Sequence, residues 1–164
     1  MNRGSSKSLL PLVEILISIG IFAVAVVLTL QLFLLARFLG DKTSDTAMAI
    51  FEVQNVAESI KSMKTGAELE KYISEDLGAA ESDGGYILYY NSSWDITGDT
   101  DEAQYILKIS DMGKDAYDSG SLYKFKLDFY KFAAYPFIDN NKLAENPDYI
   151  PLLVSVDANK FMEK

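Results

Sequence analysis

The stretch Ile15–Ala36 reads ILISIGIFAVAVVLTLQLFLLA and decides the architecture of this chain of 164 residues. Its 22 residues carry no charge, and Gln31 is the one strongly polar side chain among them. As a helix it extends about 33 Å, which is enough to cross a hydrocarbon core about 30 Å thick. A secretory signal peptide has a shorter apolar region, about 7–15 residues, followed by small residues at its cleavage site. The sequence therefore predicts a retained transmembrane helix over residues 10–40.

Charge is divided unevenly around this helix. Residues 1–40 hold three of the 15 basic residues (Arg3, Lys7 and Arg37) and one of the 24 acidic residues, Glu14. The net charge of −9 therefore divides into +2 for residues 1–40 and −11 for the remainder. Because cytoplasmic flanks of membrane helices carry an excess of Lys and Arg, we expect a cytoplasmic amino terminus and an acidic extracytoplasmic head.

The residue inventory excludes several classes of chemistry. With no Cys there is no disulfide or thiolate site, and with no His there is no imidazole base or imidazole metal ligand. We therefore expect no enzyme and no cofactor. An acidic head also lacks the clustered Lys and Arg that nucleic-acid binding needs. Lys outnumbers Arg by 13 to 2, a composition that fits a low-GC Gram-positive bacterium.

Glu14 stands one residue before the uncharged run. On position alone, its carboxylate either contacts headgroup water or lies at the apolar edge, where an unpaired charge costs a few kcal/mol and needs a designated partner. The surrounding residues resemble the amino-terminal signature of type IV prepilins and pseudopilins. The resemblance consists of the short basic leader MNRGSSKSL, the sequence Leu12-Val13-Glu14 followed by aliphatic residues, and the charge-free helix. It covers about the first 60 residues.

The resemblance implies both a processing site and a role for Glu14. In this family a peptidase removes the leader, which here corresponds to residues 1–9. The sequence departs from the family at Leu9, where Gly is usual, and at Pro11, where Thr is usual. Ser8, Leu9 and Leu10 therefore form the possible processing site, and cleavage after Ser8, cleavage at Leu9 and retention of the leader all stay open. The resemblance also implies that Glu14 pairs with the amino group of a neighbouring subunit in the apolar core of a filament.

Residues 41–64 have the pattern of an amphipathic helix. Ile50, Val53, Ala57 and Ile60 recur at spacings of three or four, and polar residues occupy the rest of the turn. We expect this apolar stripe to cover the sheet of the head. The Thr, Ser and Asp cluster after Gly40 favours a hinge or a cap between the two helical segments, whereas the resemblance favours one continuous helix.

Residues 65–164 are predicted to form an α+β extracytoplasmic head, so the expected fold is a long amino-terminal helix packed on a small antiparallel sheet, as in pilins. The sequence predicts a short helix near 67–77 and a turn at 81–85. Aromatic and β-branched residues, alternating with polar ones in the third and fourth segments, predict strands in four places. These places are residues 86–90, 105–109, 122–132 and 152–157.

The densest acidic cluster is residues 95–102, where Asp95, Asp99 and Asp101 offer oxygen ligands for calcium. Their spacing does not match the EF-hand loop, and a solvated hairpin loop explains the cluster as well. We assign no metal site and keep the three residues as calcium candidates only.

For two further sets of residues in the head, we favour a structural role over a functional one. Trp94, with Tyr89 and Tyr90 before it, offers an aromatic platform for a ligand, but aromatic residues near strands more often pack in the core or across strands. Acids near Lys114, at positions 111, 115 and 118, are expected in a solvated loop.

The sequence therefore leads to two functional hypotheses. In the first, the protein is a minor pilin or pseudopilin that assembles with other pilin subunits into a type IV pilus, a competence pilus or a type II secretion-like filament, after prepilin peptidase has acted if it is processed. In the second, it is a single-pass anchored extracytoplasmic binding or sensing domain that never polymerises, an alternative that Leu9 supports.

Overall fold

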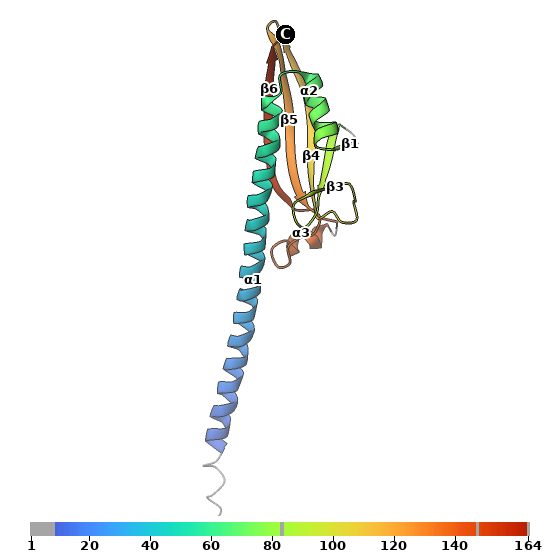
Figure 1. Cartoon of the computed structure of the whole chain (residues 1–164). Helices are drawn as coiled ribbons and strands as arrows, with labels where there is room; N and C mark the ends of the chain where they lie inside the picture. The colour runs from blue at the N-terminus through green and yellow to red at the C-terminus, as the bar shows by residue number, and fades with distance from the viewer. Residues whose placement is uncertain (1–8, 83, 147, 164) are drawn as a thin grey trace, which may run out of the picture. The chain divides into compact units, whose positions relative to one another are not determined.

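The computed structural model describes residues 9–82, 84–146 and 148–163 (Figure 1). The chain divides into two compact units, residues 1–40 and residues 41–164. One helix, α1 (Leu9–Ser62), is continuous through the boundary between them. The polar cluster after Gly40 is therefore helical and does not cap a separate helix. Thr46 shows how a polar residue is accommodated there, because its hydroxyl donates to the carbonyl of Lys42 one turn earlier at 2.8 Å.

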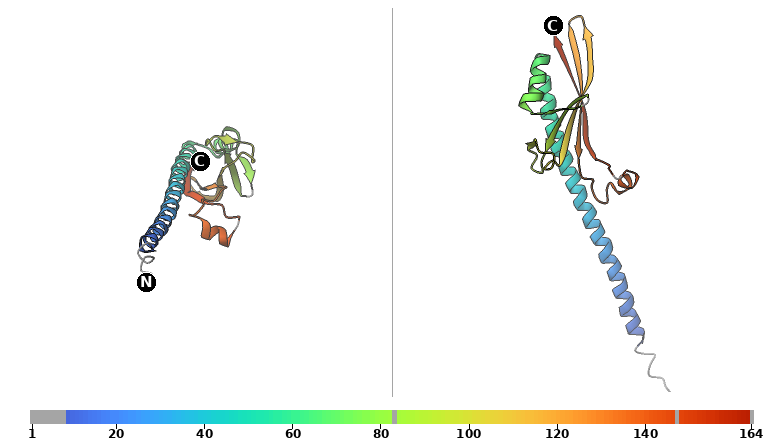
Figure 2. Two further views of the ribbon diagram at one scale, coloured as in Figure 1. Left: turned by 90° about the horizontal axis from the view of Figure 1, so that it is seen from below. Right: turned by 90° about the vertical axis from the view of Figure 1, so that its right-hand side faces the viewer.

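The second unit is built on one antiparallel sheet, which confirms the α+β layout (Figures 1 and 2). The strands are ordered β1-β2-β4-β5-β6, and the short β3 pairs with β2. Their bounds are β1 Ala80–Ser82, β2 Gly85–Tyr90, β3 Ile96–Thr97, β4 Tyr105–Tyr117, β5 Gly120–Lys131 and β6 Leu152–Glu163. A short helix, α3 (Asn140–Glu145), lies in the connection between β5 and β6.

One face of the sheet is covered by the part of α1 that belongs to this unit. The buried helix residues are Ala49, Val53, Val56, Ala57 and Ile60, and they share a single core with the inward side chains of the strands. The helix is therefore rotated slightly from the expected phase. Ile50, which we predicted in the stripe, is 39 % exposed, and Ala49 takes its place in the core.

A second layer on the same core consists of α2 (Gly66–Lys71) and the π-helical turn η1 (Tyr72–Asp76). Thr65 caps α2 by accepting a hydrogen bond from the Glu68 backbone N–H at 3.2 Å, and the Glu68 carboxylate accepts from the Lys64 backbone N–H at 2.9 Å. This reciprocal arrangement resembles a capping box and fixes the start of the helix. Leu69 and Ile73 then point into the core.

The strands differ from expectation in two places. The predicted turn at 81–85 begins inside β1, and β4 continues to Tyr117 through the residues expected to form a loop. The extension contains a bulge where the register with β5 shifts between Asp111 and Lys114. Gly113 has a φ of +94° at that point, a backbone conformation that side-chain-bearing residues rarely adopt.

Candidate functional site

The apolar part of α1 leaves its side chains uncovered. Among the described residues 11–40, eighteen large hydrophobic side chains, from Leu12 to Leu39, are between 36 % and 71 % exposed. They lie on all sides of the helix, because they occur in runs as well as at helical spacings. Each side chain of this size that leaves water contributes about 1.5–3 kcal/mol. An exposed apolar surface of this extent is typical of a site of membrane or protein contact.

This segment is long and apolar enough to cross a membrane. Two of its hydroxyl side chains bond within the helix, since Ser18 donates to the Glu14 carbonyl at 2.9 Å and Thr29 donates to the Ala25 carbonyl at 2.8 Å. Internal hydrogen bonds of this kind lower the cost of placing a hydroxyl in an apolar medium.

Glu14 lies on the surface of this helix, with its side chain exposed. It is the acid placed among the exposed apolar residues, between Val13 and Ile15. Of the possible processing residues, Leu9 and Leu10 form the first turn of α1, and Ser8 lies outside the described residues.

A polar network that the sequence analysis did not anticipate joins α1 to the sheet within the head. Asp45 on α1 accepts hydrogen bonds from the Tyr105 hydroxyl on β4 at 2.9 Å and from the Tyr135 hydroxyl at 2.5 Å. It also accepts from the Lys131 ammonium on β5 at 2.6 Å. The side chains of Asp45 and Lys131 are 13 % and 18 % exposed, so the ion pair is largely removed from water.

The ammonium of Lys131 is held by aromatic rings as well as by the carboxylate. It lies 4.4 Å from the ring centroid of Tyr135 and 5.6 Å from that of Tyr105. Both contacts are within the range of a cation–π interaction. One carboxylate, one ammonium and two phenols thus satisfy one another around a single point of α1.

The electrostatics of the network favour its charged form. Burial raises the pKa of the Asp45 carboxyl, but hydrogen bonds from Lys131, Tyr135 and Tyr105 outweigh burial and hold the pKa below its usual value of 3.8. Burial, followed by the hydrogen bond to Asp45, raises the pKa of both tyrosine hydroxyls. The two tyrosine donors therefore keep their protons while Asp45 keeps its charge.

A second ion pair extends the network along α1. Lys42, one turn before Asp45, lies 3.7 Å from the carboxylate of Asp139, which is 2 % exposed. Asp139 also accepts from the Tyr135 backbone N–H at 3.1 Å, and the ammonium of Lys42 lies 5.5 Å from the Tyr135 ring centroid. These contacts link the segment after β5 to the first turns of α1 within the head.

The calcium candidates are not brought together. In the described part of the chain, no three acidic side chains gather closely enough to hold a metal ion. Asp99 instead accepts a hydrogen bond from the Asp101 backbone N–H at 2.9 Å, which organises the loop itself.

Trp94 packs in the head rather than forming an open platform. Its ring stacks on Tyr105 at a centroid distance of 4.2 Å and on Phe129 at 5.7 Å. The backbone of Trp94 has a φ of +68°, an unusual value for a residue with a side chain. The Asn91 side chain supports this conformation by accepting hydrogen bonds from the backbone N–H groups of Ser93 and Asp95.

Comparison of the chain with protein-family models, curated proteins and solved structures finds no match.

Proposed function

We propose that the protein is a minor pilin or pseudopilin, a single-pass membrane subunit that assembles into a type IV pilus, a competence pilus or a type II secretion-like filament. The observation that carries the proposal is the exposed apolar surface of α1 with Glu14 at its amino-terminal end. In this proposal the amino terminus is cytoplasmic and the acidic head is extracytoplasmic. The partners are the membrane, other pilin subunits and, if the leader is removed, prepilin peptidase.

The same surface serves two environments in turn. Before assembly, lipid chains cover the exposed residues of the segment, and within a filament the helices of neighbouring subunits replace the lipid. Because lipid chains and apolar side chains are similar solvents for this surface, the exchange has a small hydrophobic cost. A subunit can therefore leave the membrane if specific contacts favour the filament.

Glu14 supplies such a contact. An isolated carboxylate in a low-dielectric environment is costly, whereas a carboxylate paired with an ammonium group is much less so. A subunit in the filament places Glu14 beside the amino group of its neighbour, and the pair fixes the axial register. The resemblance to prepilins is the basis for this partner.

The test compares Glu14→Gln and Glu14→Ala with the wild-type chain in cells that assemble the filament. We expect both variants to insert in the membrane at wild-type levels but to be depleted at least about tenfold from filaments sheared off the cells, since losing one partner of a buried ion pair costs a few kcal/mol. Glu58→Gln, a change on the exposed side of α1 within the head, is the matched control and should leave incorporation unchanged. Normal incorporation of both Glu14 variants would refute the role of Glu14.

The alternative, an anchored domain that does not polymerise, is favoured by Leu9, which is larger than the residue that prepilin peptidase accepts in the family. Mass spectrometry of the mature amino terminus separates the two functions. A chain that begins at Leu9 or Leu10 with a methylated amine supports the pilin, and a chain that retains Met1 supports the anchor.

A further inference from the structure

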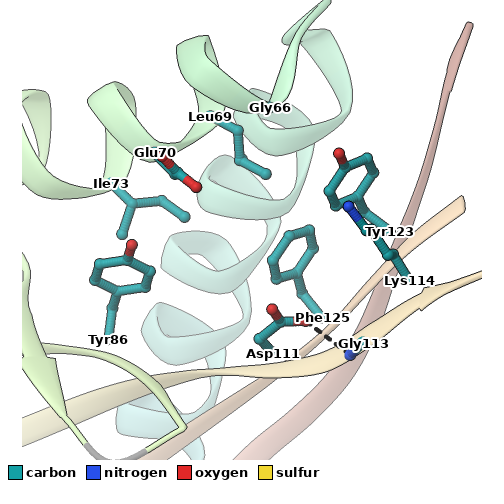
Figure 3. A pocket seen from close by; sticks show the side chains of 10 residues that line it. All are labelled: Gly66, Leu69, Glu70, Ile73, Tyr86, Asp111, Gly113, Lys114, Tyr123 and Phe125. Carbon is teal, nitrogen blue, oxygen red and sulfur yellow. Dashed lines mark hydrogen bonds between the residues drawn. The ribbon is translucent and has the colours of Figure 1, made fainter. Parts of the chain in front are cut away.

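A pocket of about 330 Å³ lies in the head between the α2–η1 segment and strands β2, β4 and β5 (Figure 3). This volume is at the lower end of the range of about 300–1,000 Å³ for ligand pockets. It therefore fits one long side chain or a molecule of similar size. The pocket takes no part in the proposed role of α1.

The deep wall of the pocket is apolar. It is formed by Leu69 on α2, Ile73 on η1 and Phe125 on β5, which are all at most 6 % exposed. Tyr86 and Tyr123 stand at its two sides (Figure 3). A wall of this kind suits an aliphatic or planar group that carries a polar end.

Two carboxylates face the pocket from different elements. Glu70 comes from α2, and Asp111 comes from β4 on the opposite side (Figure 3). The Gly113 backbone N–H at the bulge donates to one oxygen of Asp111 at 2.7 Å, which orients the carboxylate and leaves its second oxygen as an acceptor for a ligand. The pKa of the Tyr86 hydroxyl is raised by burial and then by the charges of Glu70, Glu81 and Asp111, so the potential on this side is negative.

The one basic side chain that lines the pocket lies at the other end. Lys114 follows the bulge, and its ammonium is 5.9 Å from the ring centroid of Tyr123. Figure 3 shows Lys114 beside Tyr123, away from Glu70 and Tyr86. Among the described residues that line the pocket, the charges therefore sum to −1, and the base lies apart from Glu70.

We propose that this pocket binds an arginine side chain of a partner protein, with its aliphatic stem against the apolar wall and its guanidinium between Glu70 and Asp111. A guanidinium has five N–H donors in a planar fork, which lets it bond to two carboxylates at once. The net charge of −11 on residues 41–164 favours the approach of a basic partner. Lys114 limits the affinity for cations, because its own positive charge also lines the pocket.

The experiment uses the full chain in non-ionic detergent micelles and follows binding by saturation-transfer-difference NMR. The probes are N-acetyl-arginine amide and its neutral isostere N-acetyl-citrulline amide. We expect dissociation constants in the millimolar range for the arginine probe and binding at least about fivefold weaker for the citrulline probe, since the difference between them is one charge paired with accessible carboxylates. Equal binding of the two probes would overturn the proposal.

Four variants test the geometry. Glu70→Gln and Asp111→Asn should each weaken arginine binding about two- to fivefold, and Lys114→Gln should strengthen it, because a like charge is removed. Glu75→Gln changes an exposed acid that pairs with Lys71 at 3.8 Å outside the pocket, and it should have no effect. Asp111 also supports the bulge, so Asp111→Asn can perturb folding. In that case the test of the arginine site rests on Glu70→Gln. An unchanged affinity in Glu70→Gln contradicts the proposal.

A third comparison separates a protein partner from a free metabolite. Unmodified arginine adds a carboxylate that Lys114 attracts, whereas a capped Gly-Arg-Gly peptide presents the side chain as a protein does. The peptide should bind at least as tightly as N-acetyl-arginine amide. Tighter binding of free arginine than of the peptide, together with weaker binding in Lys114→Gln, would identify a small zwitterion as the ligand and overturn the proposal.

Discussion

Replacing Asp45 by alanine removes the acceptor of three hydrogen bonds and leaves the ammonium of Lys131 without its carboxylate. A hydrogen bond to a charged group contributes about 1.5–3 kcal/mol, but the three share one acceptor and their contributions do not add. Breaking a fully buried ion pair costs about 3–5 kcal/mol. The side chain of Lys131 is 18 % exposed and regains some hydration. We therefore expect Asp45→Ala to lower the free energy of unfolding of the head by about 2–4 kcal/mol.

The assay is urea unfolding of the full chain in non-ionic micelles, followed by tryptophan fluorescence. Trp94 is the single tryptophan of the chain, and it stacks on Tyr105, so its emission reports the head at the network itself. Asp41→Ala is the matched control, because Asp41 is an exposed acid one turn earlier on α1. The control should change stability by less than about 0.5 kcal/mol. Equal effects of the two substitutions would refute the energetic role of the network.

The effect of Asp45→Ala should also depend on pH with a defined sign. The pKa of Asp45 is lowered in the folded state, so its contribution is fully present above the unfolded pKa and is lost as pH falls through the folded pKa. The difference between wild type and variant should be constant above about pH 5 and shrink below about pH 4. The raised pKa of Tyr105 and Tyr135 keeps both donors protonated in mildly alkaline solution. A difference that grows on acidification would contradict this assignment.

Three further outcomes follow from packing and from the acidic loop. Gly85→Ala should destabilise the head by at least about 1–3 kcal/mol in the same urea assay, since the added Cβ would lie 2.0 Å from the Ile109 carbonyl oxygen. Wild-type stability of this variant would disprove the close approach. Ile60→Ala, at a fully buried position, should cost about 2–5 kcal/mol, whereas Ile50→Ala should cost less than about 1 kcal/mol; an equal cost at both positions would place Ile50 in the buried stripe, as expected from sequence. The melting temperature should be the same in calcium and in chelator, because the acids of residues 95–102 do not gather; a rise with calcium would show a site there.

The central part of the sheet was predictable because one face is buried. Tyr123, Phe125, Leu127 and Phe129 alternate with polar residues in β5, and that alternation arises where a strand covers a core on one side only. The second half of β4 has no such signal. All residues from Asp111 to Tyr117 are exposed, so the strand is held by its backbone pairing with β5, which a pattern of hydrophobic residues does not reveal.

The phase of α1 and the Asp45 network were missed for a related reason. Spacings of three and four admit two neighbouring stripes on a helix, one through Ile50 and one through Ala49, and the structure buries Ala49. In the correct phase, Asp45 precedes Ala49 by four residues and Val53 by eight, so it continues the buried stripe. An acid in register with an apolar stripe is the signal that was available. Its partners Tyr105, Lys131 and Tyr135 lie 60 to 90 residues away and were not predictable without the topology.

The position of β6 in the sheet determines when the head can fold. β6 contributes Ala158 and Met162 to the core and pairs with β5 along its length, yet it follows the other described elements of the head in the chain. Helix α1, which supplies the opposite side of that core, precedes those elements in the chain. The most distant contacts of the chain therefore close the core, which makes folding slow relative to local helix formation. If the head is exported as proposed, its core is complete only after β6 has crossed the membrane.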